Sequence, residues 1–177
     1  KVSSHPKQDE INFIREENGK PFFLYFSHYA VHTPFQAKSR MTKKYEKIPK
    51  AKRQGKPVYA AMVQSVDESV GRVMDALKKL KKLDNTLVIF TSDNGGFAKA
   101  TNHAPLRGNK GSYYEGGIRV PFIIHWPGVA KAGYESEVPV ISMDLYPTCL
   151  AAAGLPPHPA QHRDGLNVLP LAKGSGS

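Results

Sequence analysis

Short, continuously apolar runs alternate along this chain with an amphipathic helical pattern, and this alternation constrains the fold more than any other feature. The runs are PFFLYFS at residues 21–27, LVIFT at 87–91 and VPFIIHW at 120–126. Residues 58–83 carry apolar side chains three and four positions apart, which predicts a helix with one buried face. Continuous apolar strands separated by helices are typical of parallel sheets. We therefore predict an α/β fold with a mostly parallel sheet flanked by helices.

The length of 177 residues and the apolar content of 40% suit a globular chain with a core. Two further helices are predicted, one over residues 9–18 and terminated at Gly19, the other over 141–153 and terminated at Gly154. The Pro- and Gly-rich segment 155–177 is predicted to run over the surface of a single domain that spans 1–177. The one cysteine, Cys149, lies in the second of these helices and is interpreted as a small buried hydrophobe.

Positive charge is concentrated in one segment of a chain whose formal net charge is +10. Nine Lys and Arg residues lie between Lys38 and Lys56, against a single acid, Glu46. Such a segment suits a nucleic acid, an acidic membrane or an anionic polymer, and it also suits a solvated surface, which we favour. Tyr45 is its only aromatic residue, so a base-stacking surface is not expected. No apolar run reaches the length of a membrane span. We predict neither a nucleic-acid nor a membrane partner.

The strand-like run 87–91 ends directly in Ser-Asp-Asn-Gly-Gly. Ligands of open α/β sheets bind beyond the carboxyl ends of the strands, so Asp93 and Asn94 fall in the predicted site region. A carboxylate and an amide oxygen are ligands that hard cations such as Ca²⁺ and Mg²⁺ accept. Asp-Asn-Gly also forms ordinary turns, and the residues alone leave both interpretations open.

Two cationic or titratable side chains lie in loops of the same predicted region. Lys110 stands between Asn109 and Gly111 in a long polar stretch, 92–119, whose length favours a functional loop. His32 follows the run 21–27 and precedes Thr33-Pro34. A lysine that points into a cavity can hold an oxyanion, and a histidine at a strand end is a candidate acid or anion ligand.

Five motifs occur in the order that is seen in the sulfatases, the arylsulfatase-like branch of the alkaline phosphatase superfamily. The motifs are PFFLYFSHYAVHTPF, YAAMVQSVDESVGRVMDALKKL, NTLVIFTSDNGG, APLRGNKGSYYEGGIRVPFIIHWPG and ISMDLYPTCLAAAGL. The chain resembles that family from Pro21 to about Leu171. The combination of SDNGG with LRGNKGSYYEGGIRVP is the most specific part. The resemblance implies a partial alkaline-phosphatase/sulfatase-like fold and the hydrolysis of sulfate esters.

The resemblance also implies roles for individual residues. Asp93 and Asn94 correspond to two ligands of the divalent cation, usually Ca²⁺. Lys110 corresponds to the lysine that binds the sulfate group, and His32 to the histidine that contacts the sulfate and the leaving-group oxygen. Both are therefore catalytic as well as substrate-binding candidates. Two further residues are possible pocket residues, namely Asn102 and His103.

The chain departs from the family pattern in its nucleophile. Sulfatases use a formylglycine made from a Cys/Ser-x-Pro-x-Arg motif, and these 177 residues contain no such motif. The expectation is a central-to-C-terminal fragment of a sulfatase that is inactive alone and binds Ca²⁺ poorly, because Asp93 and Asn94 supply few of the roughly six to eight oxygens that Ca²⁺ takes. Formylglycine is expected in the parent protein.

Two other functions stay open from the sequence. One is a phosphoesterase or phosphonate hydrolase of the same superfamily, and the other is non-enzymatic binding of sulfated glycans. The expected partner is a sulfate ester, with a sulfated polysaccharide indicated by the basic segment. The resemblance implies a periplasmic or secreted parent.

Overall fold

The computed structural model describes residues 8–16 and 19–175. Contacts divide the chain into two compact units. Unit 1 comprises Lys1–Lys82 and Gly95–Ile118, and unit 2 comprises Leu83–Asn94 and Arg119–Ser177. The prediction of a single domain stays a prediction, and the two units are described separately.

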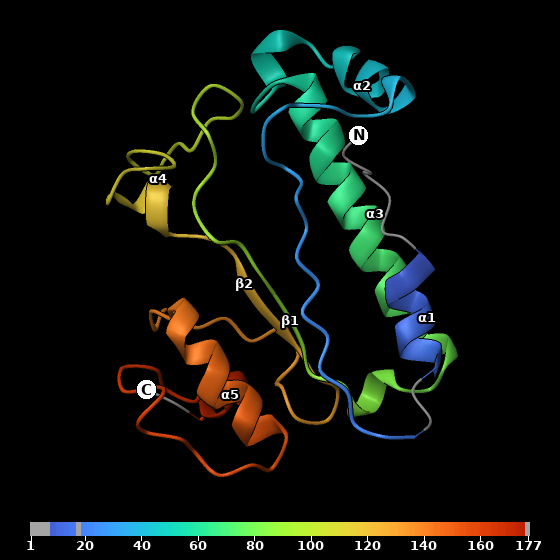
Figure 1. Ribbon diagram of the computed structural model, residues 1–177. Helices are drawn as coiled ribbons and strands as arrows, with labels where there is room; N and C mark the ends of the chain where they lie inside the picture. Colours follow the sequence, from blue (N-terminus) through green and yellow to red (C-terminus); the bar gives the residue numbers. More distant parts are fainter. Residues whose placement is uncertain (1–7, 17–18, 176–177) are drawn as a thin grey trace. The chain divides into compact units, whose positions relative to one another are not determined.

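Unit 1 is organised around the long helix α3, Pro57–Lys79. Helices α1, Gln8–Glu16, and α2, Ser39–Glu46, both contact α3 (Figure 1). The remaining elements of the unit are the 3₁₀ turn η1, Lys50–Lys52, and the one-turn helix α4, Glu115–Ile118.

The core of unit 1 lies under the apolar face of α3, as the spacing predicts. That face is made of six residues, all buried or half-buried: Met62, Val66, Val70, Val73, Leu77 and Leu80. Ile14 of α1 is fully buried and Met41 of α2 is 4% exposed. Pro57 is tolerated because the first turn of a helix has no use for its missing N–H. The prediction of an amphipathic helix here is confirmed.

The segment 21–29 of unit 1 differs from its prediction. It is extended, and its side chains alternate between exposed and half-buried, but it is not assigned as a strand. Phe23 is 72% exposed and Tyr25 is 79% exposed, whereas Phe22, Leu24 and Phe26 are half-buried. The predicted buried strand is therefore wrong for the described residues, because an extended segment becomes a strand only when neighbouring backbone completes its ladder.

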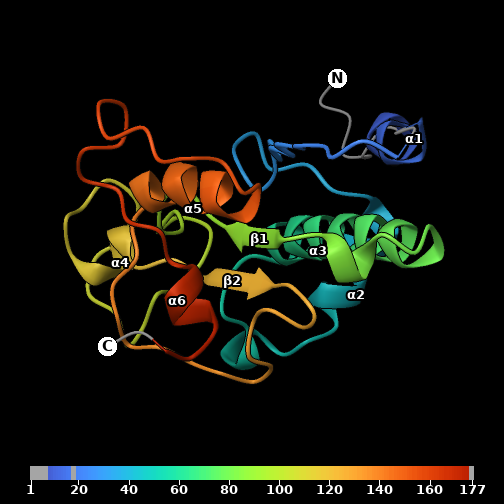
Figure 2. The same cartoon turned by 90° about the horizontal axis from the view of Figure 1, so that it is seen from below.

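Unit 2 contains the strand pair β1, Val88–Thr91, and β2, Phe122–His125 (Figure 2). The two strands are antiparallel, with Val88 opposite His125 and Thr91 opposite Phe122. Parallel neighbours were expected. A parallel pair requires a crossover, usually through a helix of some length, whereas the described connection between these strands holds only the four-residue α4.

The rest of unit 2 consists of helix α5, Leu145–Ala152, helix α6, Leu169–Ala172, and two 3₁₀ turns, η2 (Leu83–Asn85) and η3 (Ser142–Asp144). Helix α5 is followed by Gly154 with φ +68, which confirms the predicted glycine stop. Cys149, which was predicted to be buried, is half-buried, and this partial burial raises the pKa of its thiol.

The C-terminal segment is exposed through most of 155–164 and then returns to the core of unit 2. Val168 is 4% exposed, and its backbone N–H donates to the Thr148 hydroxyl at 3.0 Å. The buried Asp144 carboxylate accepts from the backbone N–H groups of Ile141 and Leu166, each at 2.8 Å. These side chains fix the end of the chain onto α5. Among the helices that the structure describes, none is both long and apolar enough to cross a membrane.

Candidate functional site

The loop Gly95–Ile118 of unit 1 is held together by backbone hydrogen bonds. Gly95 N–H donates to the Gly117 carbonyl at 2.8 Å, and Gly116 N–H donates to the Arg107 carbonyl at 2.7 Å. A Cβ atom at Gly95 would collide with the Gly116 carbonyl. The first glycine of SDNGG therefore lets the backbone at Gly95 lie close to the backbone at Gly116, which a side chain would prevent.

Gly96 joins two of the candidate site residues. Its carbonyl accepts from the backbone N–H of Lys110 at 2.9 Å. A Cβ atom on Gly96 would lie 2.6 Å from His103 Nε2, so the imidazole ring rests against the glycine backbone. Lys110 is exposed, which leaves its side chain accessible to an anion. The structure thus brings Lys110 and His103 to one place through a residue that must be small.

His103 carries an unusual polar atom. Its Nε2 is buried and has no hydrogen-bond partner among the described residues. A buried, unsatisfied ring nitrogen costs about 1–3 kcal/mol, so it is normally paired in the functional state. The prediction that His103 is a pocket residue is consistent with an atom that still lacks a partner.

Asn102, the second possible pocket residue, is engaged by its own backbone neighbours. Its side-chain oxygen accepts from Ala104 N–H at 3.0 Å. Its backbone N–H donates to the Gln54 carbonyl at 2.8 Å, and its carbonyl accepts from Gln54 Nε2 at 3.2 Å. The side-chain amide oxygen of Asn102 therefore shapes the turn, and its backbone joins this loop to the basic segment.

His32 is exposed, and its ring orientation is fixed by the next residue. His32 Nδ1 lies 3.0 Å from the Thr33 carbonyl oxygen. A carbonyl oxygen only accepts, so Nδ1 carries the proton of this hydrogen bond. His32 Nε2 is then the nitrogen left to accept a proton or, in the imidazolium, to donate one.

A ring contact links the His32 loop to the Gly96 loop. Phe35 lies 6.4 Å from Phe97 and 5.8 Å from Tyr59, measured between ring centroids. Phe97 follows Gly96 directly, so this aromatic cluster places the segment after His32 beside the loop that carries Lys110 and His103. Burial raises the pKa of the Tyr59 phenol, as expected inside such a cluster.

The two predicted cation ligands lie in unit 2, directly after β1. Asp93 is exposed and Asn94 is half-buried. The Ser92 hydroxyl donates to the Asn94 carbonyl at 3.0 Å and closes the turn between them. A carboxylate and an amide oxygen fit a hard divalent cation in their chemistry. No group of three or more His, Cys, Asp and Glu side chains suited to a metal occurs within 8–16 and 19–175, so this pair alone would supply only part of a coordination shell.

Two hollows of about 400 Å³ each lie along the same loop of unit 1. The first is lined by Asn102, His103 and Asn109, among others. The second is lined by residues of the basic segment and by Lys99. The contact between the basic segment and the loop Gly95–Ile118, the site loop, was not predicted. Gln54 and Asn102 are far apart in the chain, and no local sequence pattern indicates that they are in contact.

The comparisons with known proteins agree on one family. A family model described as Sulfatase matches residues 8–155. The chain belongs to the sulfatase family. A sulfatase of Formosa agariphila is 40% identical over 172 residues, which cover 89% of this chain and 31% of that protein. The human N-acetylgalactosamine-6-sulfatase is 36% identical over 92% of this chain and 31% of its own length.

A comparison with solved structures concerns the fold. The crystal structure of Ps i-CgsB in complex with k-i-k-neocarrahexaose is 43% identical, with a TM-score of 0.82, over 92% of this chain and 36% of that chain. The predicted α/β class and sulfatase-like fold are confirmed. The chain spans about a third of the length of these sulfatase relatives.

Proposed function

We propose that the protein containing this chain hydrolyses sulfate esters, and that Lys110 and His32 contact the sulfate group. The observation that carries the proposal is the junction at Gly96, where the Lys110 backbone and the His103 ring meet in a chain of the sulfatase family. An exposed lysine and a buried, unsatisfied ring nitrogen that both adjoin Gly96 suit a tetrahedral anion, which brings several acceptor oxygens.

In the proposed chemistry, Lys110 offsets negative charge on the sulfate as its ester bond breaks. Fixed positive charge aimed at the reacting group is commonly the largest contribution to such catalysis. His32 acts through Nε2, because Nδ1 is held by the Thr33 carbonyl. In its imidazolium form it would donate a proton to the departing alcohol oxygen. His103 would complete its hydrogen bonding on the bound anion, and Asn102 would line the pocket.

Asp93 and Asn94 are the proposed ligands of a divalent cation, with Ca²⁺ as the expected ion. A bound cation supplies positive charge beside the substrate oxygens. We further propose that the 177 residues alone bind Ca²⁺ weakly, because two protein oxygens fall short of roughly six to eight. Calorimetry of the 177-residue chain with Ca²⁺ tests this, and saturable binding tighter than about 10 μM would contradict it.

The nucleophile proposed for the whole protein is a formylglycine. The 177 residues contain no Cys/Ser-x-Pro-x-Arg motif, so we propose that they show no turnover alone. Measurable hydrolysis of an aryl sulfate by the purified 177-residue chain would overturn this point.

A sulfated polysaccharide is the proposed substrate class. Support comes from the basic segment and from the relatives, one of which is named for a sulfated amino sugar and another solved with k-i-k-neocarrahexaose. The family's character also supports a periplasmic or secreted protein, which cell fractionation would test.

The whole protein should be assayed with an aryl sulfate and the matched aryl phosphate. The proposal predicts a kcat/KM that is higher for the sulfate by about a hundredfold or more. A preference for the phosphate would favour the second candidate, a phosphoester or phosphonate hydrolase. That candidate draws support from a Silicibacter pomeroyi phosphonate monoester hydrolase, which is 31% identical with a TM-score of 0.56 over 68% of this chain.

A further inference from the structure

The basic segment Lys38–Lys56 is joined directly to the loop that carries the candidate sulfate-binding residues. An isolated antiparallel bridge pairs Gly55 with Thr101. Lys56 N–H donates to the Ala100 carbonyl at 2.8 Å, and a Cβ atom at Gly55 would collide with that same carbonyl. The end of the basic segment, residues 54–56, is therefore held against the site loop by backbone contacts, while the lysines of the segment are exposed, as favoured from the sequence.

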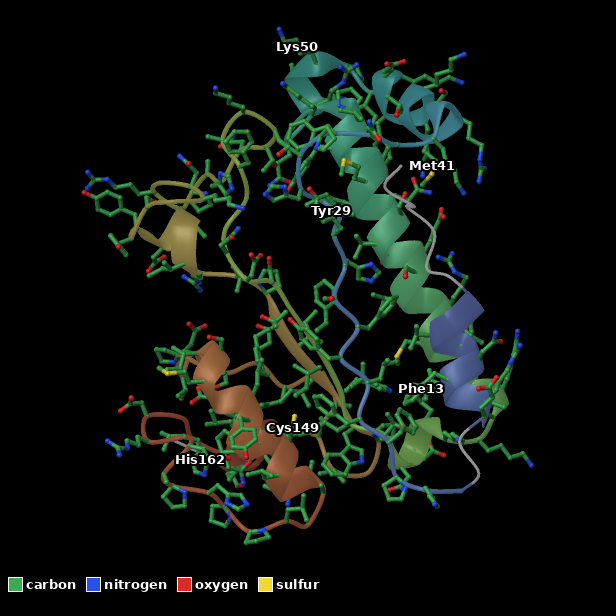
Figure 3. All side chains as sticks on the ribbon, in the orientation of Figure 1. Phe13, Tyr29, Met41, Lys50, Cys149 and His162 are labelled. Atoms are coloured by element: carbon green, nitrogen blue, oxygen red, sulfur yellow. The ribbon has the colours of Figure 1, made fainter. Side chains whose placement is uncertain are left out.

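Arg53 forms hydrogen bonds with the backbone of the basic segment itself. Arg53 Nε donates to the Ile48 carbonyl at 2.6 Å, and Nη2 donates to the Glu46 carbonyl at 2.5 Å. The guanidinium thereby closes the turn between α2 and η1. Charge-assisted hydrogen bonds of this kind are stronger than neutral ones, so the backbone that bears Lys50 is held in place. Figure 3 places Lys50 where α3 begins.

The hollow beside this bridge has cationic walls. Its lining includes four basic residues, Lys50, Arg53, Lys56 and Lys99. None of the described residues that line it is acidic. Like charges gathered around a concave surface repel one another and raise the local concentration of anions. The hollow is therefore suited to a negatively charged group.

This cationic hollow adjoins the hollow of the candidate site. Both are lined by Ala98, Thr101 and Asn102, and His103 lines only the hollow of the candidate site. Each has a volume of about 400 Å³, near the lower end of the range for small-ligand sites. A ligand with two anionic groups on neighbouring units can thus place one in each hollow.

We propose that the hollow lined by Lys50, Lys56 and Lys99 is a second anion subsite, which takes a further sulfate group of a multiply sulfated oligosaccharide. The proposal rests on the proposed function, since the neighbouring hollow is lined by His103, which we propose to bind the sulfate group, and lies on the loop that carries Lys110. A nucleic acid is the less suitable ligand, because Tyr45 is the only aromatic residue of the basic segment. The subsite would select substrates by their sulfate density.

The test compares two paired variants of the whole protein. Lys50→Gln with Lys56→Gln removes two charges from the hollow. Lys43→Gln with Lys47→Gln removes two charges from exposed positions of the same basic segment that line neither hollow. Calorimetry at low salt measures the affinity of each variant for a hexasaccharide with several sulfates and for the same hexasaccharide with one terminal sulfate. Circular dichroism verifies that each variant is folded.

The expected result is a change in the ratio of the two affinities. The preference for the multiply sulfated hexasaccharide should fall about three- to tenfold in the Lys50/Lys56 variant, since two exposed charge contacts to the additional sulfate groups are lost. It should stay within about twofold in the Lys43/Lys47 variant. An equal change in both variants, or none in either, overturns the subsite.

A single-stranded oligonucleotide of matched charge is the control ligand that tests whether the surface binds any polyanion. Binding as tight as that of the multiply sulfated hexasaccharide, and equally sensitive to Lys50/Lys56, would overturn a sulfated-sugar subsite. Failure of the proposed function is a separate observation, because it would appear as absent hydrolysis of every sulfate ester, whatever the affinity ratio shows.

Discussion

Two segments of unit 1 carry family motifs, yet they differ in how their backbones are hydrogen-bonded. The site loop Gly95–Ile118 has little regular structure, but its glycine backbone is tied at several points to its own neighbours. The segment 21–29 is strongly apolar and reads as a strand, but it is extended without an assigned ladder, and Phe23 and Tyr25 are largely exposed.

The difference lies in where the stabilising contacts come from. The loop obtains them within a short stretch of chain, because Gly95 and Gly116 let backbone approach backbone. A strand obtains its ladder from other strands, which local sequence cannot supply. We conclude that the site loop is held by backbone contacts within Gly95–Ile118 and by its hydrogen bonds to residues 54–56. The extended segment is held chiefly by its half-buried face.

The largest effect is expected for Gly95→Ala, which places a methyl group in the close backbone contact of the site loop. The added methyl group would collide with the Gly116 carbonyl and the Gly117 Cα atom, both part of the backbone, so no side chain can move aside. The free energy of unfolding of the 177-residue chain should fall by about 3 kcal/mol. Urea denaturation measures it. A loss below about 1 kcal/mol would show that the loop is looser than described.

A smaller effect is expected for Phe22→Ala in the extended segment. Phe22 packs edge-on against Phe13 with ring centroids 6.0 Å apart, and the Lys82 ammonium lies 5.6 Å from its ring. Because Phe22 is only half-buried, the free energy of unfolding should fall by about 1.5 kcal/mol. The same urea titration tests this. If Phe22→Ala cost more than Gly95→Ala, the ranking of the two regions would be reversed.

Gly71→Ala is the matched control for the glycine argument and should have the opposite sign. Gly71 lies in the exposed face of α3, where a Cβ atom would meet nothing within 4 Å. Alanine has the higher helix propensity, so the free energy of unfolding should rise by about 0.5–1 kcal/mol. Thermal unfolding followed at 222 nm measures the gain. If Gly71→Ala lowered the free energy of unfolding, the loss measured for Gly95→Ala could not be assigned to close backbone contact.

The smallest effect is expected for Tyr25→Ser on the exposed face of the extended segment. Tyr25 is 79% exposed, so its removal should change the free energy of unfolding of the 177-residue chain by less than about 0.5 kcal/mol. Chemical denaturation of this variant beside Phe22→Ala compares the two faces of one segment. Equal losses would refute the alternation of burial along it.

The sequence was informative wherever structure is set by neighbours in the chain. The periodicity of 58–83 predicted α3, and Gly154 marked the end of α5. The antiparallel pairing of β1 with β2 was not predicted, because apolar character indicates a strand but not the direction of its partner.

The candidate site was predicted in its residue types but not in its connections. Lys110 and His103 were both named from the sequence, whereas their common contact at Gly96 follows from loop geometry alone. The bridge between Gly55 and Thr101 links segments far apart in the chain, and neither partner carries a recognisable motif. Long-range backbone contacts of this kind leave no periodic signal.

The most direct test of the account is the effect of Lys110→Ala on sulfate-ester hydrolysis by the whole protein. Lys78→Ala, at an exposed position near the end of α3, is the control with the same change of charge. The account predicts that kcat/KM for an aryl sulfate falls about a hundredfold or more in Lys110→Ala, because one charged contact to the reacting group is lost, and changes less than about twofold in Lys78→Ala. A Lys110→Ala variant that keeps the activity of the unmodified protein would contradict it.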